Sequence, residues 1–200
     1  MEKPLNMASK RNVTAFMILL ALGFSLAAQT SGRQENSDVK VDYAALQQDI
    51  LRFETAVNQV VNSTFSASPF AVVQKPKGAY LQPYGIAFTF LINIHRAVIR
   101  TPFGDVRSRP DMTPDLKKRL IEELKENLIR VLQDDGEVFR QLPKDDYVTI
   151  VAFIEDRNFP DEPVGNKTIV LSVLKKDLDE LGQKNDRLKE FKQRMKIIEY

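Results

Sequence analysis

One segment of the sequence alternates between large apolar side chains and smaller or more polar ones over about ten residues. From Ile86 to Ile94 every second position is Ile or Phe. Successive side chains of a strand point to opposite faces of a sheet, so this spacing predicts a long strand with one face in the core. The apolar positions are Ile86, Phe88, Phe90, Ile92 and Ile94, and those between them are Ala87, Thr89, Leu91, Asn93 and His95. Any fold of this chain therefore has to bury one face of a sheet.

Further strands are expected on both sides of this one. Residues 147–154 are apolar on both faces, which is typical of a central, buried strand, and residues 167–173 form a second buried run. A polar loop over 155–166 joins these two, so we expect them to be neighbours in the sheet. Before the long strand, residues 79–81 have extended character and follow a turn that we expect at 76–78.

The first helix is expected from Tyr43 onward. Its apolar residues are spaced alternately three and four apart, which gives one narrow apolar stripe, and Asp42 is suited to cap the first turn. The stripe consists of Tyr43, Leu46, Ile50, Phe53, Val57 and Val60. A stripe of this width fits a helix that packs on its own sheet, and it also fits a coiled-coil seam through which the chain could self-associate.

Two more helices follow. Thr113-Pro114 is a helix start, and a broad apolar face continues toward Leu132 before Asp134-Asp135-Gly136 ends or bends the helix. The charged tail after Leu174 is also helical in pattern, and Gly182 divides it. Residues 195–200 fit either a final strand or the end of the last helix.

These elements follow the order α-β-β-α-β-β-α. Hairpin-type links between strands and amphipathic helices between strand pairs predict an α+β fold. We expect a small, mainly antiparallel sheet of four to five strands with three amphipathic helices, formed by a single domain over residues 41–200.

The N-terminus has the three parts of a secretory signal peptide over residues 1–28. Lys3, Lys10 and Arg11 form a basic head, residues 13–28 are uncharged and largely apolar, and small residues follow at the end. The apolar stretch is shorter than the roughly 20 residues of a membrane-spanning helix. We expect cleavage, a flexible lead-in over residues 29–40, and a periplasmic or secreted protein with no membrane span, the alternative being an uncleaved anchor.

The charge balance excludes one class of partner. The chain has 29 basic and 27 acidic residues, and removal of residues 1–28 takes away three basic and one acidic residue, which leaves no net charge. No overall electrostatic attraction to nucleic acid is expected. The chain contains no cysteine, which excludes disulfides, thiolate metal sites and thiol nucleophiles.

Two strand entries carry short aromatic and proline motifs. One is Tyr80-Leu81 followed by Tyr84-Gly85, and the other is Leu142-Pro143 followed by Asp146 and Val148-Thr149. Together they resemble segments of a family of uncharacterised secreted bacterial proteins of the cell envelope. The resemblance implies an envelope or secreted location, and it implies no activity.

A loop with three arginines is the strongest candidate for a binding site. Residues 100–112 carry Arg100, Arg107 and Arg109 around Phe103-Gly104-Asp105, between a strand and a helix. Three guanidinium groups could bind a carboxylate or phosphate on a partner. The alternative interpretation is a solvated loop with local ion pairs.

A second candidate is a small-ligand site near Tyr80, Tyr84 and His95. His95 is the only histidine, and two tyrosines beside a glycine could line a groove. A general base needs a nucleophile within reach, and no nucleophile motif is present. The acidic clusters lack the alternating spacing of calcium loops, so we assign no catalytic residue, metal or cofactor.

Two functions remain open. The first is a non-enzymatic, exported protein-interaction module that binds another envelope or secreted protein through a sheet edge, the first helix or the arginine loop. The second is a small-ligand-binding protein or hydrolase with a site near Tyr80, Tyr84 and His95.

Overall fold

The computed structural model describes residues 41–68, 70–96, 98–107, 113–155, 167–182 and 185–200. The expected signal peptide and lead-in, residues 1–28 and 29–40, lie outside the described residues. Residues Lys40–Tyr200 form a compact unit of their own. Its elements are α1 (Tyr43–Thr64), β1 (Val72–Leu81), β2 (Gly85–Asn93), β3 (Val98–Thr101), β4 (Gly104–Arg107), α2 (Pro114–Asp135), η1 (Gly136–Val138), β5 (Tyr147–Glu155), β6 (Lys167–Leu174), α3 (Lys175–Leu181), η2 (Asn185–Arg187), α4 (Leu188–Arg194) and β7 (Lys196–Glu199).

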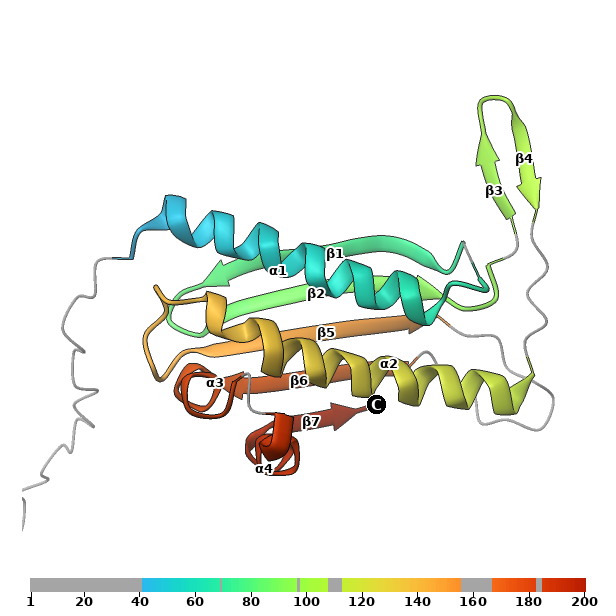
Figure 1. Cartoon of the computed structure of the whole chain (residues 1–200). Helices are drawn as coiled ribbons and strands as arrows, with labels where there is room; N and C mark the ends of the chain where they lie inside the picture. Colours follow the sequence, from blue (N-terminus) through green and yellow to red (C-terminus); the bar gives the residue numbers. More distant parts are fainter. Residues whose placement is uncertain (1–40, 69, 97, 108–112, 156–166, 183–184) are drawn as a thin grey trace, which may run out of the picture. The chain divides into compact units, whose positions relative to one another are not determined.

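The main sheet has five strands in the order β1-β2-β5-β6-β7 (Figure 1). β1 and β2, β5 and β6, and β6 and β7 pair antiparallel, whereas β2 and β5 are parallel. The parallel pair follows from the connection, because the chain returns from the end of β2 through α2 before it enters β5. The α+β fold and a five-stranded, mainly antiparallel sheet are thus confirmed.

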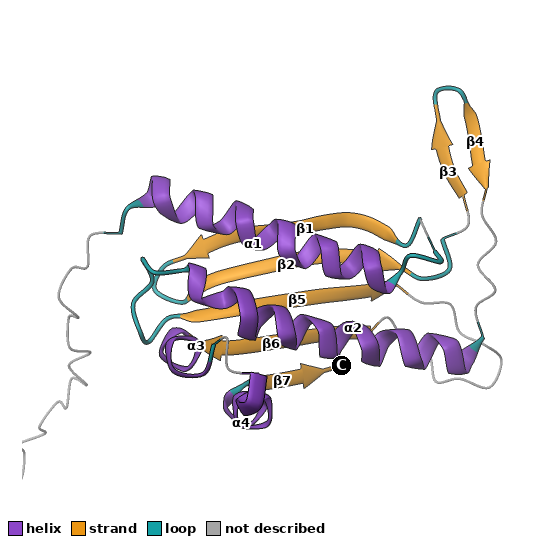
Figure 2. Ribbon diagram, viewed as in Figure 1, coloured by secondary structure: helices purple, strands orange, loops and turns teal. Residues whose placement is uncertain are grey.

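One face of the sheet forms the core. The alternate residues that the sequence predicts to be buried, from Ile86 to Ile92 on β2 and Ile94 just after it, are all at most 1% exposed. The matching positions of β5 are Val148, Ile150, Ala152 and Ile154, and they are equally buried. Figure 2 shows α1 and α2 lying across the sheet, and they cover this face.

Helix α1 begins as expected. The Asp42 carboxylate accepts hydrogen bonds from the backbone of Ala44 and Ala45, at 3.0 and 3.1 Å. Phe53 lies on the stripe and packs against Phe88 and Phe139, with ring centroids 4.7 and 5.2 Å away. Most of the stripe therefore packs on the chain's own sheet, while Tyr43 at its start is exposed.

Helix α2 also matches its sequence signals. The Thr113 hydroxyl accepts a hydrogen bond from the backbone of Leu116, Pro114 occupies the first helical position, and the helix ends at Gly136. The tail divides at Gly182 into α3 and α4, as expected, and the last residues form the edge strand β7.

Two expectations about turns are wrong. Residues 76–78 lie inside β1 and do not form a turn. The register with β2 shifts on both sides of Gln74. β1 is also an edge strand, where the missing N–H of Pro76 is tolerated. Glu54 of α1 holds this stretch by accepting hydrogen bonds from the Gly78 backbone and from Lys77. The arginine loop is a hairpin over its first part, because β3 and β4 pair with each other.

Candidate functional site

The β3–β4 hairpin ends in a two-residue tip, Pro102-Phe103. The Thr101 hydroxyl donates to the Gly104 carbonyl at 2.7 Å and accepts from the Phe103 backbone N–H at 3.2 Å. Gly104 has a φ of +117°, a conformation that residues with a side chain rarely adopt. Proline fixes its own φ as well. These four residues therefore hold the tip in a defined conformation without help from the rest of the molecule.

The side chain presented by this tip is apolar and fully exposed. Phe103 is 101% exposed, more than any other large hydrophobic residue among those described, and Val106 on β4 is about half exposed. β3 and β4 form a two-stranded sheet separate from the five-stranded one. An aromatic ring in this position contributes nothing to the core.

Two of the three arginines predicted to bind a partner lie in the hairpin. Arg100 is exposed on β3 and lies opposite Asp105, and Arg107 ends β4 opposite Val98. Arg109 lies outside the described residues. From the sequence, the arginines are the candidate binding residues, and Phe103 is named only as part of their loop. The signal for the tip was present in Thr101-Pro102-Phe103-Gly104, a turn sequence between two short apolar-containing segments.

Tyr80, Tyr84 and His95 do not come together. Tyr80 is paired with Ile86 and lies on the helix side of the sheet, with its ring 6.3 Å from that of Tyr43. The Tyr84 hydroxyl shares a 2.7 Å hydrogen bond with the Thr149 hydroxyl on the other side, and its ring stacks on Tyr147. His95 follows the far end of β2, so the length of that strand separates it from both tyrosines.

Tyr80 has a different neighbour, the carboxyl group of Asp146. A shallow groove of about 320 Å³ lies between α1 and β1, and Tyr43 and Tyr80 are among its lining residues. The Tyr80 side chain lies close to Asp146, which is 8% exposed and whose Oδ2 atom is buried with no hydrogen-bond partner. Burial raises the pKa of Asp146, against the effect of the nearby Tyr80 hydroxyl, and burial also raises the pKa of Tyr80.

A second hollow, of about 430 Å³, lies between α1, the end of α2 and η1. It is lined by both signs of charge, including Asp49, Asp135, Arg52 and Arg140. Burial raises the pKa of Asp49 although both arginines oppose the shift, and burial and Asp134 together raise that of Asp135. Nowhere in the described ranges do three or more His, Cys, Asp or Glu side chains gather in a way that could hold a metal ion.

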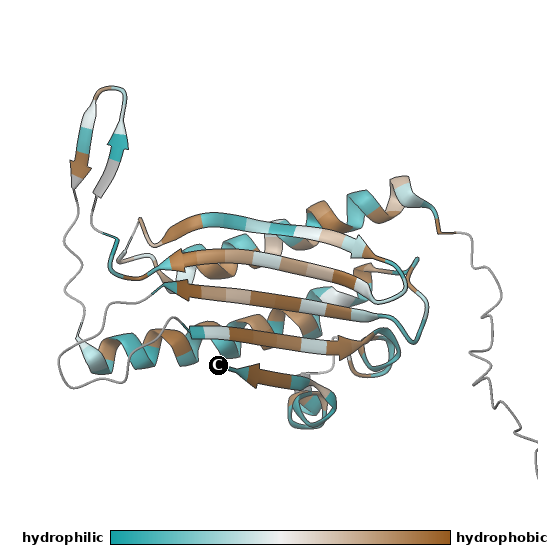
Figure 3. Ribbon diagram, turned by 180° about the vertical axis from the view of Figure 1, so that it is seen from behind, coloured by the Kyte–Doolittle hydropathy of each residue, from teal (hydrophilic) through white to brown (hydrophobic). Residues whose placement is uncertain are grey.

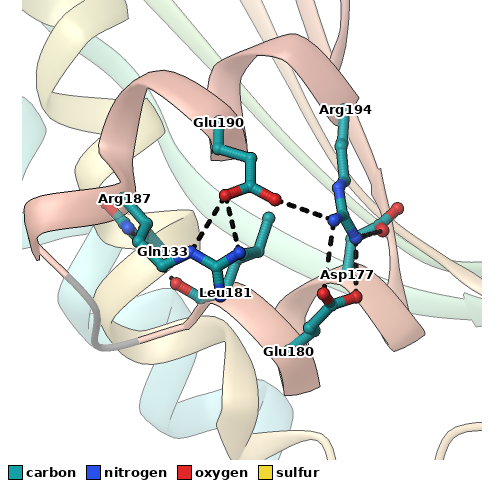
Figure 4. Close-up of polar contacts among 7 residues, drawn as sticks. All are labelled: Gln133, Asp177, Glu180, Leu181, Arg187, Glu190 and Arg194. Atoms are coloured by element: carbon teal, nitrogen blue, oxygen red, sulfur yellow. Dashed lines mark hydrogen bonds and ion pairs between the residues drawn. The ribbon is translucent and has the colours of Figure 1, made fainter.

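The densest group of ion pairs joins α3 to α4 and serves the fold (Figure 4). Arg194 binds Asp177 at 3.0 Å, Glu180 at 2.6 Å and Glu190 at 2.8 Å. Arg187 also reaches Glu190, and these bonds lower the pKa of that carboxyl group. Its arginines are satisfied by the chain's own carboxylates, so this cluster is not a candidate binding site.

Comparisons of the chain with protein-family models, with curated proteins and with solved structures gave no match. In the part of the chain that the structure describes, none of the helices combines the length and the apolar character needed to cross a membrane.

Proposed function

We propose that this chain is an exported, non-enzymatic protein-interaction module that binds a partner protein through the tip of the β3–β4 hairpin. The observation that carries the proposal is the full exposure of Phe103 on a tip that local hydrogen bonds already fix. Export rests on the basic and apolar pattern of residues 1–28.

The tip has the properties of an interface anchor. Buried aromatic side chains dominate the energy of many protein interfaces, each contributing about 2 kcal/mol or more. A tip that is rigid before binding loses little conformational entropy when it binds. Phe103 therefore fits an apolar pocket on the partner, and Arg100 lies close enough to the tip to meet an acidic group at the rim of that pocket.

The charge next to the tip favours a protein partner over a lipid surface. Asp105 lies two residues from Phe103 and is exposed. Anionic headgroups attract basic residues and repel a carboxylate. The tip presents one aromatic ring beside a carboxylate and, opposite it on β3, the basic Arg100, and this mixed charge matches a pocket of defined shape better than an anionic bilayer.

Affinity capture from the cell tests this proposal. The protein is tagged at its C-terminus and compared with Phe103→Ser and, as a matched control, Leu51→Gln, which removes another exposed apolar side chain far from the hairpin in the sequence. We expect the native protein and Leu51→Gln to recover the same partner at similar yield. Phe103→Ser is expected to lose at least about 90% of it, since a loss of 2 kcal/mol lowers affinity roughly 30-fold. Equal recovery by all three proteins would contradict the proposal.

A small-ligand site at Tyr80 is a second candidate, favoured by the unpartnered Oδ2 atom of Asp146. A ligand with a flat apolar body could pack on Tyr43 and Tyr80, and its N–H donor could bond to the Asp146 carboxyl group, which neighbours Tyr80 but does not itself line the groove. Titration with tryptamine, followed by the ring NMR signals of the two tyrosines, tests it. Signals that shift in the native protein and not in Asp146→Asn would support this site, and unchanged signals in both would argue against it.

A further inference from the structure

The five-stranded sheet has a second face, opposite α1 and α2, on which no helix of the described residues packs. In Figure 3, seen from behind, the strands lie in front of both helices. The register of the strands identifies the residues on this face. On β2, β5, β6 and β7 they are Ala87, Thr89, Leu91, Asn93, Tyr147, Thr149, Val151, Phe153, Glu155, Thr168, Val170, Ser172, Leu174, Lys196 and Ile198. Three of the small ones, Thr149, Thr168 and Ser172, are at most 8% exposed, whereas the larger apolar side chains are half-buried or exposed. We refer to this surface as the open face.

The centre of the open face is apolar. Leu91 pairs with Phe153, and Val151, Val170 and Ile198 follow one another across β5, β6 and β7. Phe153 is 42% exposed and Ile198 is 38% exposed. Five apolar side chains on four adjacent strands make a continuous patch, and patches of this kind mark contact surfaces.

The parallel pair β2 and β5 at the centre also indicates that the open face is a contact surface. Parallel strands such as β2 and β5 usually have both faces covered, and their sequences are apolar on both sides. β5 has that composition, because Val151 and Phe153 on the open face alternate with the core residues Ile150 and Ala152. The strand is therefore suited to burial on the side that the described helices leave open.

On β2, β5, β6 and β7 the charge of the open face is confined to its two ends. Glu155 lies at the end of β5, where Asn93 donates a 3.0 Å hydrogen bond to it, and Lys196 lies at the start of β7. Lys196 is in register with Ser172, and Ser172 with Thr149. The two charges are thus about six residues apart along the strands, or about 20 Å.

We infer that the open face binds a second copy of this chain, sheet against sheet, with the strands of the two copies antiparallel. In a twofold contact each surface meets itself. This arrangement brings Glu155 of each copy and Lys196 of the other to the same end of the interface, keeps like charges apart, and buries both apolar centres. Aligned sheets of this kind pack about 10 Å apart.

The area of the open face is sufficient for a specific dimer. A strand of nine residues such as β5 is about 30 Å long, and the four strands of the open face span about 19 Å. Each copy would then bury up to about 570 Å², or about 1,100 Å² in total, which exceeds the roughly 1,000 Å² expected of a biological interface.

Sedimentation equilibrium of the full-length gene product, as the cell processes it, tests the inference. We expect twice the chain mass for the native protein, and a dissociation constant at least about 30-fold higher for Phe153→Asp, which places a charge in the centre of the patch. A native protein that remains monomeric up to about 100 μM would overturn the inference. An unchanged dimer in Phe153→Asp would overturn it as well.

Charge reversal provides the second test and leaves the apolar patch intact. Lys196→Glu and Glu155→Lys should each weaken the dimer, because each places like charges at one end of the interface. The double variant restores unlike charges and should recover most of the native affinity. Failure of the double variant to recover it would overturn the antiparallel arrangement. Neither test involves Phe103, so its outcome is independent of the function proposed for the hairpin.

Discussion

Gly85 and Gly104 both have a positive φ, yet the space available for a side chain differs between them. A side chain at Gly85 would overlap the backbone of Tyr147 in the neighbouring strand, whereas nothing lies within 4 Å of the corresponding position at Gly104. Gly85→Ala should therefore destabilise the fold by about 3 kcal/mol or more, because strain and overlap add. Gly104→Ala should change global stability by less than about 1 kcal/mol, since β3 and β4 pair only with each other. Urea unfolding of both variants checks this, and equal effects would contradict it.

Asp146 gives a pH-dependent prediction at the same scale. Burial raises its pKa in the folded protein, so the folded state binds the proton more tightly than the unfolded chain does. Native stability is then lost as the pH rises from the unfolded pKa, about 3.9, through the raised folded value. Asp146→Asn should be about 1 kcal/mol more stable than the native protein at pH 7 and equally stable near pH 3.

Thermal unfolding at several pH values measures this difference. Asp186→Asn is the matched control, because that carboxylate is exposed and is not among the groups that shift the pKa of Asp146. A stability gain for Asp146→Asn that does not change with pH would contradict the argument.

The edge strand β7 is expected to depend on pH in the opposite direction, through Glu199. Hydrogen bonds from Lys125 and Lys167, at 2.9 and 3.0 Å, lower its pKa and tie the strand to α2 and β6. Its contribution is present above the unfolded pKa and is lost as the pH falls through the lowered folded value. Glu199→Gln should be about 1 kcal/mol less stable than the native protein at pH 7 and equal to it near pH 2, which denaturant unfolding at both pH values would show. A difference that persists at pH 2 would contradict this role.

Arg194 is expected to hold α3 and α4 together. Because it bonds to carboxylates on both helices, Arg194→Gln should speed amide hydrogen exchange several-fold in α3 and α4 and leave β2 and β5 unchanged. Lys189→Gln, an exposed change on α4, is the control. Exchange that speeds up throughout the chain, or nowhere, would argue against this role.

The sequence predicted most elements where local signals decide them. Asp42 and Thr113 begin their helices, and Gly182 divides the tail, as their chemistry requires. Local signals misled where a distant residue decides the outcome. Pro76 and Gly78 indicate a turn by themselves, and Glu54 of α1 and the sheet edge keep them in β1.

At the scale of the whole molecule, the arrangement of strands could be predicted only in part. The antiparallel pairs β1–β2 and β5–β6 are neighbours in the sequence. The pairing of β6 with β7 spans α3 and α4, the pairing of β2 with β5 spans α2, and neither has a local signal. The same limit applies to the candidate site. The three arginines predict a binding site in residues 100–112, and this stays a prediction, whereas the exposure of Phe103 and the separation of Tyr80, Tyr84 and His95 follow from the fold.

Export gives the first prediction at this scale. We expect the protein recovered from the envelope or the medium to begin near residue 29, because residues 1–28 have the pattern of a cleaved signal. Intact-mass measurement checks it. A chain that keeps its first 28 residues would favour the membrane-anchored alternative.

The central claim is that the hairpin tip binds a partner protein, and photocrosslinking from position 103 tests it most directly. A photoreactive phenylalanine analogue replaces Phe103 in the native cell, and the same analogue at Leu51 is the control. We predict that position 103 gives one dominant cross-linked protein and that position 51 does not give it. Cross-links that are absent from position 103, or the same from both positions, would contradict the proposal.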